Sequence, residues 1–426
     1  MNKRYFFDTS SLLLHAEDIF EFFSKTEQYF LISSITLQEL EKIKSSVHKD
    51  DNVKYLARLV TFLLEKYSNL YEVISHKTEY EQLINREGFE INNDTKILAD
   101  VLHIAQEYNT INLHFITDDL SLKHIGKNFT NIKGKYHNFH IGEFKEDNNY
   151  TGYLEVIPTE EELEKFYSNP NENIFNLKIN QYLVILDTEK QIKDIRVWTG
   201  ETHRYLKEKT FYSDDLGAVK PYQGDIYQKM VCDSLINNKL TMIKGPAGTG
   251  KSYLSLGYLL SMLRNHQIDK IVVFCNTIAT AHSAKLGFYP GTKDEKLLDS
   301  QIGNFLASKL GGRIAVESLI QQEKLILLPF SDIRGYDTSG MRAGVYITEA
   351  QNLDRVLMKL ALQRIGEDCI CIIDGDDKTQ VDDIHFSGNN NGMRRVSKIY
   401  RGEDIYGEIE LKNIYRSKIA HIAEKI

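Results

Sequence analysis

The stretch LTMIKGPAGTGKSYLSLGYLL, residues 240–260, decides how the second half of this 426-residue chain folds. An apolar segment of strand character leads into a turn with three glycines, and a segment with helical apolar periodicity follows. From Gly245 to Ser252 the pattern is GxxxxGKS, which is typical of a phosphate-binding loop between a strand and a helix. Glycines let successive backbone N–H groups turn inward around phosphate oxygens, where a Cβ would clash. The stretch therefore predicts a nucleotide-binding α/β domain.

Each position of this loop has an expected role. The helix beginning near Lys251 would add the partial positive charge of its N-terminus. Lys251 would reach the β- and γ-phosphates of ATP, and the Ser252 hydroxyl would ligate Mg²⁺. An ordinary Gly-rich turn before a helix is the alternative, but the flanking strand and helix favour the phosphate loop. We expect nucleotide contacts from Gly245, Pro246, Ala247, Gly248, Thr249, Gly250, Lys251 and Ser252.

Strand-like and helix-like segments alternate on both sides of a region of different character. Residues 1–145 alternate in this way, and so do residues 219–426, which predicts a parallel α/β sheet in each. Residues 146–218 are rich in Asn, Tyr, Thr and Glu with short strand candidates, which indicates a small β-rich connector. The predicted fold class is therefore α/β, with two sheet-based domains joined by this connector.

Composition limits the protein class without naming a partner. Hydrophobic residues make up 42% of the chain, which is enough for real cores, and the net charge is −8. Charge alone therefore does not indicate nucleic acid, so such a partner must be inferred from sites. The sequence has no run of 18 apolar residues and no signal-peptide pattern, so we expect a cytoplasmic protein.

The residues for hydrolysis are expected at other strand ends, because open α/β sheets bind ligands at the carboxyl edge. In GVYITEAQNLD, residues 344–354, an apolar strand ends at Glu349. In CIIDGDDKTQVDD, residues 371–383, Asp374-Gly375-Asp376 closes a strand and Gln380 follows. A glutamine there can sense a γ-phosphate or orient water. Turn chemistry alone also accounts for Asp and Gly at these positions.

These motifs, in this order, resemble the PhoH-type ATPases, which are P-loop enzymes related to superfamily-one helicases. The resemblance covers about residues 217–426. It rests on GPAGTGKS, LGFYPGTKDEKL (286–297), IRGYD (333–337), YITEAQNLD, RIGED (364–368), DGDDKTQVD and YRSKIAHIA (415–423).

The resemblance implies further roles. In VKPYQGDIYQ, residues 219–228, Gln228 is expected to read the adenine edge. An arginine is expected to reach the γ-phosphate, in cis or from a neighbouring subunit, and Arg416 and Arg364 are the candidates. A surface arginine paired with a carboxylate is the alternative for either. The family also implies a homo-oligomer, such as a hexameric ring.

One position departs from the family pattern. The family usually has Asp-Glu where this chain has Thr348-Glu349, and that Asp normally helps to hold magnesium through its water shell. Glu349, which is expected to polarise water, is kept. A threonine hydroxyl can hydrogen-bond a magnesium-bound water but lacks the charge. We therefore expect intact ATP binding and slower hydrolysis, and the alternative is a site that only binds nucleotide.

Four acids in the first half lie at strand ends and helix starts: Asp8, Glu39, Asp94 and Asp119. In a parallel sheet these points can converge at the carboxyl edge. Carboxylates that face each other repel unless divalent cations neutralise them, and oxygen-only ligation suits Mg²⁺ or Mn²⁺. Such a cluster can activate water for attack on a phosphodiester. Asp100 would join if its helix started late. Helix capping and turn chemistry explain each acid singly.

The order of these acids resembles the PIN-domain ribonucleases over about residues 3–130. The match is strand-Asp-Thr, then helix-Glu, then Asp, then Thr-x-Asp, which points to Asp119 with Thr117 as a hydroxyl partner. Ser10 would steady the metal-bound water. The resemblance suggests single-stranded RNA as the partner. Lys133, Lys135 and the run at 393–395 are candidates for phosphate contacts, with a solvated surface as the alternative.

The sequence thus predicts a PIN-like ribonuclease domain (1–145), a β-rich connector (146–218) and a PhoH-like ATPase domain (219–426). An RNA-stimulated ATPase would unwind or pull RNA and feed it to a metal-dependent endoribonuclease. Two alternatives stay open: a nucleic-acid remodeller with an inert PIN-like domain, and a nucleotide-gated scaffold. The choice between RNA and DNA also stays open.

Overall fold

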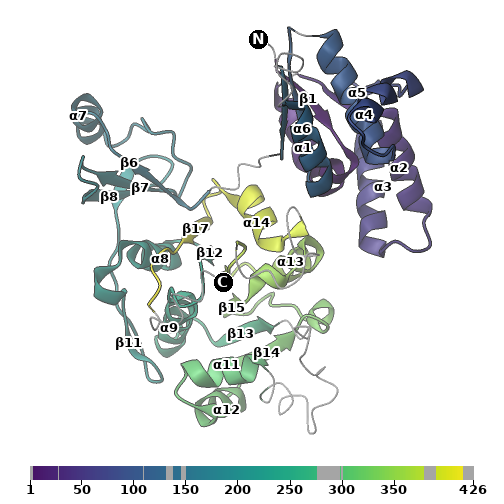
Figure 1. Cartoon of the computed structure of the whole chain (residues 1–426). Coiled ribbons are helices and arrows are strands. Elements are labelled where there is room, and N and C mark those ends of the chain that lie inside the picture. The colour runs from purple at the N-terminus through teal and green to yellow at the C-terminus, as the bar shows by residue number, and fades with distance from the viewer. Residues whose placement is uncertain are drawn as a thin grey trace. The chain divides into compact units, whose positions relative to one another are not determined.

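The computed structural model divides into two compact units, residues 1–148 and 149–426, which are described separately (Figure 1). The described residues are 3–26, 28–108, 110–130, 138–144, 150–275, 298, 301–378 and 390–415. Within these ranges, no helix combines the length and the apolar character needed to cross a lipid bilayer.

The first unit is built on a five-stranded sheet in the order β3-β2-β1-β4-β5, in which neighbouring strands are parallel. The strands are β1 (Lys3–Phe7), β2 (Phe30–Ser33), β3 (Tyr71–Ile74), β4 (Asn112–Ile116) and β5 (Phe139–Gly142). The connecting helices include α1 (Thr9–Thr26), α2 (Ser34–Ser45), α3 (Asp51–Lys66), α4 (Glu81–Arg86), α5 (Asn93–Glu107) and α6 (Leu120–Thr130). The predicted parallel α/β sheet is confirmed.

Both faces of this sheet are buried. Phe6 packs in one apolar cluster with Phe115, whereas its neighbour Phe7 packs in another with Phe20 and Phe30. Consecutive strand residues point to opposite faces, so two separate clusters mean that helices cover both sides. The unit is therefore an α/β/α sandwich, as predicted, and β1 lies at its centre.

The predicted β-rich connector forms a mixed four-stranded sheet. Its strands, in the order β6-β7-β8-β9, are β6 (Tyr153–Val156), β7 (Tyr182–Leu186), β8 (Ile192–Trp198) and β9 (His203–Tyr205). Helix α7 (Glu160–Ser168) covers one face, where Phe166 packs with Trp198. On the other face Tyr153 and Tyr182 join the core that also holds Ile243 of the following sheet. A hairpin, β10 (Phe211–Ser213) and β11 (Gly217–Val219), follows.

The second unit is dominated by a six-stranded parallel sheet in the order β14-β13-β15-β16-β12-β17 (Figure 1). Its strands are β12 (Leu240–Lys244), β13 (Lys270–Cys275), β14 (Leu325–Pro329), β15 (Ala343–Ile347), β16 (Ile370–Gly375) and β17 (Tyr406–Glu410). The helices around it include α8 (Ile226–Asn237), α9 (Lys251–Arg264), α11 (Gln301–Lys309), α12 (Arg313–Gln321), α13 (Arg355–Leu362) and α14 (Gly392–Tyr400).

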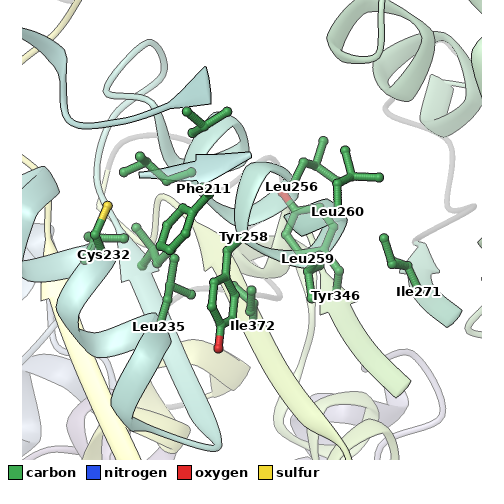
Figure 2. Packing of buried hydrophobic residues seen from close by; sticks show 14 of the residues in the cluster. Phe211, Cys232, Leu235, Leu256, Tyr258, Leu259, Leu260, Ile271, Tyr346 and Ile372 are labelled. Atoms are coloured by element: carbon green, nitrogen blue, oxygen red, sulfur yellow. The ribbon is translucent and has the colours of Figure 1, made fainter. Parts of the chain in front are cut away.

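The core of this sheet fixes the helix that follows the phosphate loop. Tyr258 and Leu259 of α9 belong to one apolar cluster with Tyr346 of β15 and Ile372 of β16, as Figure 2 shows. A second cluster, which includes Val345 and Ile373, covers the opposite face. Strands buried on both faces need nearly continuous apolar sequence, and this explains runs such as Ile271–Cys275.

Gly152 marks a close approach between the small sheet and the large one. Its φ is +85°, and the Tyr182 N–H donates to its carbonyl at 2.9 Å. A Cβ added at Gly152 would lie 1.4 Å from the Glu408 carbonyl oxygen on β17. The Glu410 N–H donates to the Thr151 carbonyl at 2.9 Å, which continues the contact. The segment before β6 therefore lies directly against β17.

Replacing Gly152 with alanine should destabilise the second unit, because overpacking of this kind costs about 1–3 kcal/mol or more. Gly217→Ala is the matched control, since Gly217 also has a positive φ (+64°) but nothing lies within 4 Å of an added Cβ. Thermal unfolding followed by circular dichroism should show a lower unfolding temperature for G152A than for G217A. Equal unfolding temperatures would contradict the close contact with β17.

Candidate active sites

The phosphate loop has the backbone that its glycines predict. It connects the end of β12 at Lys244 to the start of α9 at Lys251. Gly245, Gly248 and Gly250 have φ angles of 139°, 89° and 94°, a region that L-residues with a Cβ rarely adopt. Space is also limiting, since a Cβ at Gly245 would lie 2.5 Å from the Leu411 carbonyl oxygen. The sequence pattern thus reflects a steric requirement at these positions.

The lysine and serine of the loop point to different partners. Lys251 Nζ donates to the carbonyl oxygens of Gly245, at 2.6 Å, and Pro246, at 3.0 Å. The ammonium therefore spans the inside of the loop, where a phosphate charge would be attracted. Ser252 Oγ donates to Asp374 Oδ2 at 3.2 Å, which connects the helix start to the end of β16.

Strand register brings Asp374 to this position. In the sheet, Asp374 pairs with Ile243 of β12, and Ile373 pairs with Ile347 of β15. The buried Tyr346 hydroxyl also donates to Asp374 Oδ2, at 2.6 Å. Burial raises the pKa of the Asp374 carboxyl, the Tyr346 hydrogen bond and the Lys251 charge lower it, and the Glu349 charge raises it. Sequence reasoning placed Asp374 only at a strand end and missed its contact with Ser252.

Thr348 is buried beside this carboxylate. Its side chain is 4% exposed, and among the described residues its Oγ1 has no hydrogen-bond partner of ordinary geometry. The hydroxyl nevertheless lies close enough to help lower the pKa of Asp374, after burial, Tyr346 and the charges described above. Within the described part of the chain, Thr348 is therefore a buried hydroxyl beside Asp374 that lacks a hydrogen-bond partner of ordinary geometry.

Glu349 has a strained backbone and faces the cleft. Its φ and ψ are 51° and 39°, a left-handed conformation that is uncommon for a residue other than glycine and that clusters at functional sites. Gln351 Nε2 donates to Glu349 Oε2 at 2.6 Å, and Gln351 Oε1 accepts from the Asp376 N–H at 3.1 Å. Gln351 thereby holds the glutamate against the end of β16. The sequence analysis missed this residue.

A cleft of about 1210 Å³ joins these groups to an aromatic pair. Its lining includes the loop residues Gly248, Lys251 and Ser252, and Glu349. Tyr222 and Tyr415 also line it, with ring centroids 4.4 Å apart. The cleft thus offers a phosphate-binding end and an aromatic surface suited to a flat base.

Gln228 also lines the cleft, but backbone groups of Tyr222 and Thr249 already form hydrogen bonds with its side-chain amide. Its Oε1 accepts from the Tyr222 N–H at 2.8 Å, and its Nε2 donates to the Thr249 carbonyl at 2.8 Å. A Cβ at Gly250 would lie 2.8 Å from this Nε2, so the glycine makes room for the glutamine. In this arrangement Gln228 ties the phosphate loop to the segment before α8, and reading of an adenine edge stays a prediction.

One of the two predicted arginines, Arg364, is not among the residues that line this cleft. Arg364 follows α13 and precedes β16, so it lies at the amino edge of the sheet, opposite to the phosphate loop. Its carbonyl accepts from the Thr338 hydroxyl at 2.6 Å. The cis alternative for Arg364 is therefore wrong, because the sheet separates it from the loop, whereas a role in a neighbouring subunit stays a prediction. Arg416, Gln380, Lys133, Lys135 and the motif at 286–297 lie outside the described residues.

Two residues of the run at 393–395 are engaged within the protein. Met393 is fully buried in the core. Arg394 donates from Nη2 to the Asp377 carbonyl at 2.7 Å, and its Nε lies 3.3 Å from Asp377 Oδ2. This arginine thus ties α14 to the segment after β16, and phosphate contacts of the run stay a prediction.

In the first unit the adjacent ends of β1 and β4 place Asp8 among hydroxyl groups. Phe7 pairs with Ile116, so Asp8 and Thr117 leave the sheet side by side. The Asp8 carboxylate accepts from Ser10 Oγ at 2.9 Å, the Ser11 N–H at 2.9 Å and Thr117 Oγ1 at 2.8 Å. Burial raises the pKa of Asp8, and these hydrogen bonds lower it.

The other three acids surround the same edge. The hydroxyl of Thr9, the residue after Asp8, donates a hydrogen bond to the Glu39 carboxylate. The Asp119 N–H donates to Thr117 Oγ1 at 3.1 Å, and Asp119 Oδ1 accepts from the Leu122 N–H at 2.7 Å. Partial burial and the charges of Glu39 and Asp119 raise the pKa of Asp94. The structure thus brings Asp94 close to Glu39 and Asp119, and Thr117 connects Asp8 with the backbone of Asp119.

Asp100 belongs to a different cluster. Its helix begins at Asn93, and its carboxylate accepts from Ser33 Oγ at 2.6 Å and lies 2.7 Å from His76 Nδ1. It is fully buried and ties α5 to the end of β2. The expectation that Asp100 could join the acidic site is therefore wrong.

The acidic edge fits a divalent cation in its chemistry. Carboxylates and hydroxyls are the hard oxygen ligands that Mg²⁺ and Mn²⁺ prefer, and the mutual repulsion felt at Asp94 favours a neutralising cation. As the side chains stand, no group of three or more His, Cys, Asp or Glu within the described ranges could hold a metal ion. The carboxylates of Asp8 and Glu39 are instead engaged by neighbouring hydroxyls.

Comparison with known proteins agrees with this two-site architecture. A family model described as PIN domain matches residues 5–128, and one described as PhoH-like protein matches residues 222–426. Protein PhoH2 of Bacillus subtilis (strain 168) is 25% identical over 452 aligned residues, which cover 99% of both chains.

Other relatives match the chain over shorter lengths. Protein PhoH2 of Thermobispora bispora is 28% identical over 204 residues, covering 47% of this chain and 45% of that protein. A PhoH-like protein of Bacillus subtilis (strain 168) is 31% identical over 186 residues, covering 43% of this chain and 56% of its own length. The chain therefore carries a PIN domain at residues 5–128 and a PhoH-like domain at residues 222–426, and it is similar to Protein PhoH2 over its full length.

Proposed function

We propose that this chain is an ATP-dependent RNA-processing enzyme, in which a PhoH-like ATPase unwinds or translocates RNA and a PIN domain cleaves it with Mg²⁺ or Mn²⁺. The observation that carries the proposal is the convergence of Lys251, Ser252 and Glu349 on one cleft, with the buried Asp374 carboxylate in contact with Ser252. A chain that only stored or scaffolded nucleotide would need the phosphate loop but not the carboxylates beside it.

The residues of the cleft divide the work of ATP hydrolysis. The loop N–H groups and Lys251 bind the phosphates, and Tyr222 and Tyr415 offer a surface on which the base can stack. Glu349, oriented by Gln351, positions and polarises the attacking water. Mg²⁺, when bound through Ser252, would neutralise charge on the phosphate oxygens. Binding and positioning supply most of the rate in such reactions.

The PIN domain would cut phosphodiester bonds at its acidic edge. Asp8, Glu39, Asp94 and Asp119 are the residues that would hold a divalent ion, and the ion would supply an activated water. Thr117 donates to the Asp8 carboxylate and accepts from the Asp119 backbone N–H, and Ser10 also donates to Asp8, so these hydroxyls orient the Asp8 carboxylate. Single-stranded RNA as the substrate rests on the PIN relationship.

Assembly into a homo-oligomer, such as a hexameric ring, is part of the proposal. Arg364 lies at the amino edge of its own sheet and can approach a γ-phosphate only in a neighbouring copy. Arginines that act in trans stabilise the transition-state charge in related reactions.

A second candidate function is a nucleotide-gated remodeller or scaffold with an inert PIN domain. It is favoured by one observation: hydroxyls of Thr9, Ser10 and Thr117 engage the carboxylates of Asp8 and Glu39, and within the described ranges no group of acids is positioned to hold an ion. The two candidates differ in whether RNA is cleaved.

Glu349→Gln should lower the ATP turnover rate about 100-fold or more while leaving nucleotide affinity within about twofold, because the amide keeps the shape but not the basicity. Steady-state phosphate release and titration of a fluorescent ATP analogue measure the two quantities. Glu403→Gln, an exposed glutamate of the same unit, is the control. Equal, near-zero rates in wild type and E349Q would instead support a site that only binds nucleotide.

Asp94→Asn should raise the unfolding temperature of the metal-free protein at neutral pH, because it removes a charge repelled by Glu39 and Asp119. The difference should vanish as the pH falls through the raised pKa of Asp94, where the wild-type carboxyl becomes neutral. Mn²⁺ should stabilise the wild type but not D94N in differential scanning fluorimetry. Glu90→Gln, a nearby exposed glutamate, should keep the Mn²⁺ effect. An equal Mn²⁺ effect in D94N would argue against a metal site at these acids.

Asp8→Asn should reduce Mn²⁺-dependent cleavage of single-stranded RNA about 100-fold or more, since it removes the buried carboxylate at the centre of the edge. The ATP turnover rate of the same preparation reports that the second unit is intact. Glu65→Gln, on the exposed side of α3, is the control variant: it is purified in the same way and should cleave RNA like the wild type. Identical cleavage by wild type and D8N would rule out this nuclease site, and turnover unresponsive to RNA would favour the scaffold.

A further inference from the structure

Thr348 and Asp374 are neighbours on adjacent strands, and only Asp374 carries charge. Ile347 pairs with Ile373, so Thr348, the first residue after β15, lies beside Asp374, which is still part of β16. Strand β16 lies between β15 and the phosphate-loop strand β12. A carboxylate on β16 is therefore one strand closer to the loop than a carboxylate on β15 would be.

Asp374 contacts Ser252, the residue whose hydroxyl is expected to ligate Mg²⁺. Its side chain is 1% exposed, and its Oδ2 accepts from Ser252 Oγ at 3.2 Å and from the Tyr346 hydroxyl at 2.6 Å. A serine hydroxyl has one proton and two lone pairs. Ser252 can therefore donate its proton to Asp374 and keep a lone pair for a cation. Asp374 also interacts with the charges of Lys251 and Glu349.

The unsatisfied hydroxyl of Thr348 is an independent sign that a ligand completes this site. Its Oγ1 is buried beside Asp374 and finds no hydrogen-bond partner of ordinary geometry in the described part of the chain. A buried hydroxyl without a partner is destabilising by about 1–3 kcal/mol unless water or an ion's hydration shell satisfies it. A hydrated cation held by Ser252 and charge-balanced by Asp374 would provide that partner.

We infer that Asp374, at the end of β16, supplies the carboxylate of the magnesium shell whose usual place on β15 is occupied by Thr348. The site thus keeps its negative charge on the neighbouring strand, and Thr348 contributes an uncharged hydroxyl to the water shell. This inference rests on the proposed ATP-binding function. It assigns the magnesium dependence of nucleotide binding to Asp374.

The test is the effect of Mg²⁺ on nucleotide affinity, which does not require turnover. A fluorescent ATP analogue is titrated into the full-length protein in EDTA and in Mg²⁺. We expect Mg²⁺ to tighten binding to the wild type about tenfold or more and to Asp374→Asn less than about twofold, with Kd in EDTA similar for both. Asp404→Asn, an exposed carboxylate of the same unit, should respond like the wild type.

Thr348→Asp in the D374N background gives a second measurement, because it returns one carboxylate to the site on the neighbouring strand. We expect the double variant T348D/D374N to recover the Mg²⁺ effect that D374N lacks. A folded double variant that stays as unresponsive to Mg²⁺ as D374N would overturn the inference, because it would mean that the loss in D374N is not the loss of a carboxylate beside the cation. An undiminished Mg²⁺ effect in folded D374N would overturn it as well.

Failure of the proposed function has a different signature. A wild-type protein that binds no nucleotide, or binds it equally in EDTA and in Mg²⁺, contradicts ATPase function itself. A wild type that responds to Mg²⁺ alongside a D374N protein that responds equally leaves the proposed function in place and removes only the role of Asp374.

Discussion

One backbone hydrogen bond joins the two halves of the nucleotide site. The Gly245 N–H, at the first residue of the phosphate loop, donates to the Gly375 carbonyl at the end of β16, 3.2 Å away. A Cβ at Gly375 would lie 2.5 Å from Gln351 Oε1, so the glycine also admits the side chain that holds Glu349. The phosphate loop, the end of β16 and Glu349 are thus held together by a contact that involves only small residues.

Much of the fold and the central part of this site could be predicted, because the information is local. A strand, three glycines, Lys251, Ser252 and a helix follow one another within 21 residues of sequence, and each glycine meets a steric requirement that the structure shows. The role of Asp374 could not be found in this way. It depends on β16 lying between β12 and β15, and strand order is a property of the whole sheet, not of any segment.

Long-range pairing also explains the other differences. Arg364 lies in a family motif, but the direction of α13 takes it to the edge opposite the phosphate loop. Asp100 lies six residues after Asp94 in the sequence. Its carboxylate is instead bound by Ser33 and His76, which are distant in sequence. In the acidic edge, Asp94 interacts with the charges of Glu39 and Asp119, and a shared metal site for the four carboxylates stays a prediction. The hydroxyl of Thr9 that binds Glu39 could not be anticipated, because the pair is 30 residues apart.

The position of Asp374 affects how homologous sequences are classified as active or degenerate. A search that scores one column for aspartate would discard this chain as a pseudoenzyme at Thr348. Side chains at the ends of two adjacent strands share one small space, so the total charge of both positions matters more than the residue at either one. A substitution at one position can therefore be offset by an acid at the other, 26 residues away in sequence. Paired inspection of both columns would separate inactivated paralogues from those that moved their acid to the next strand.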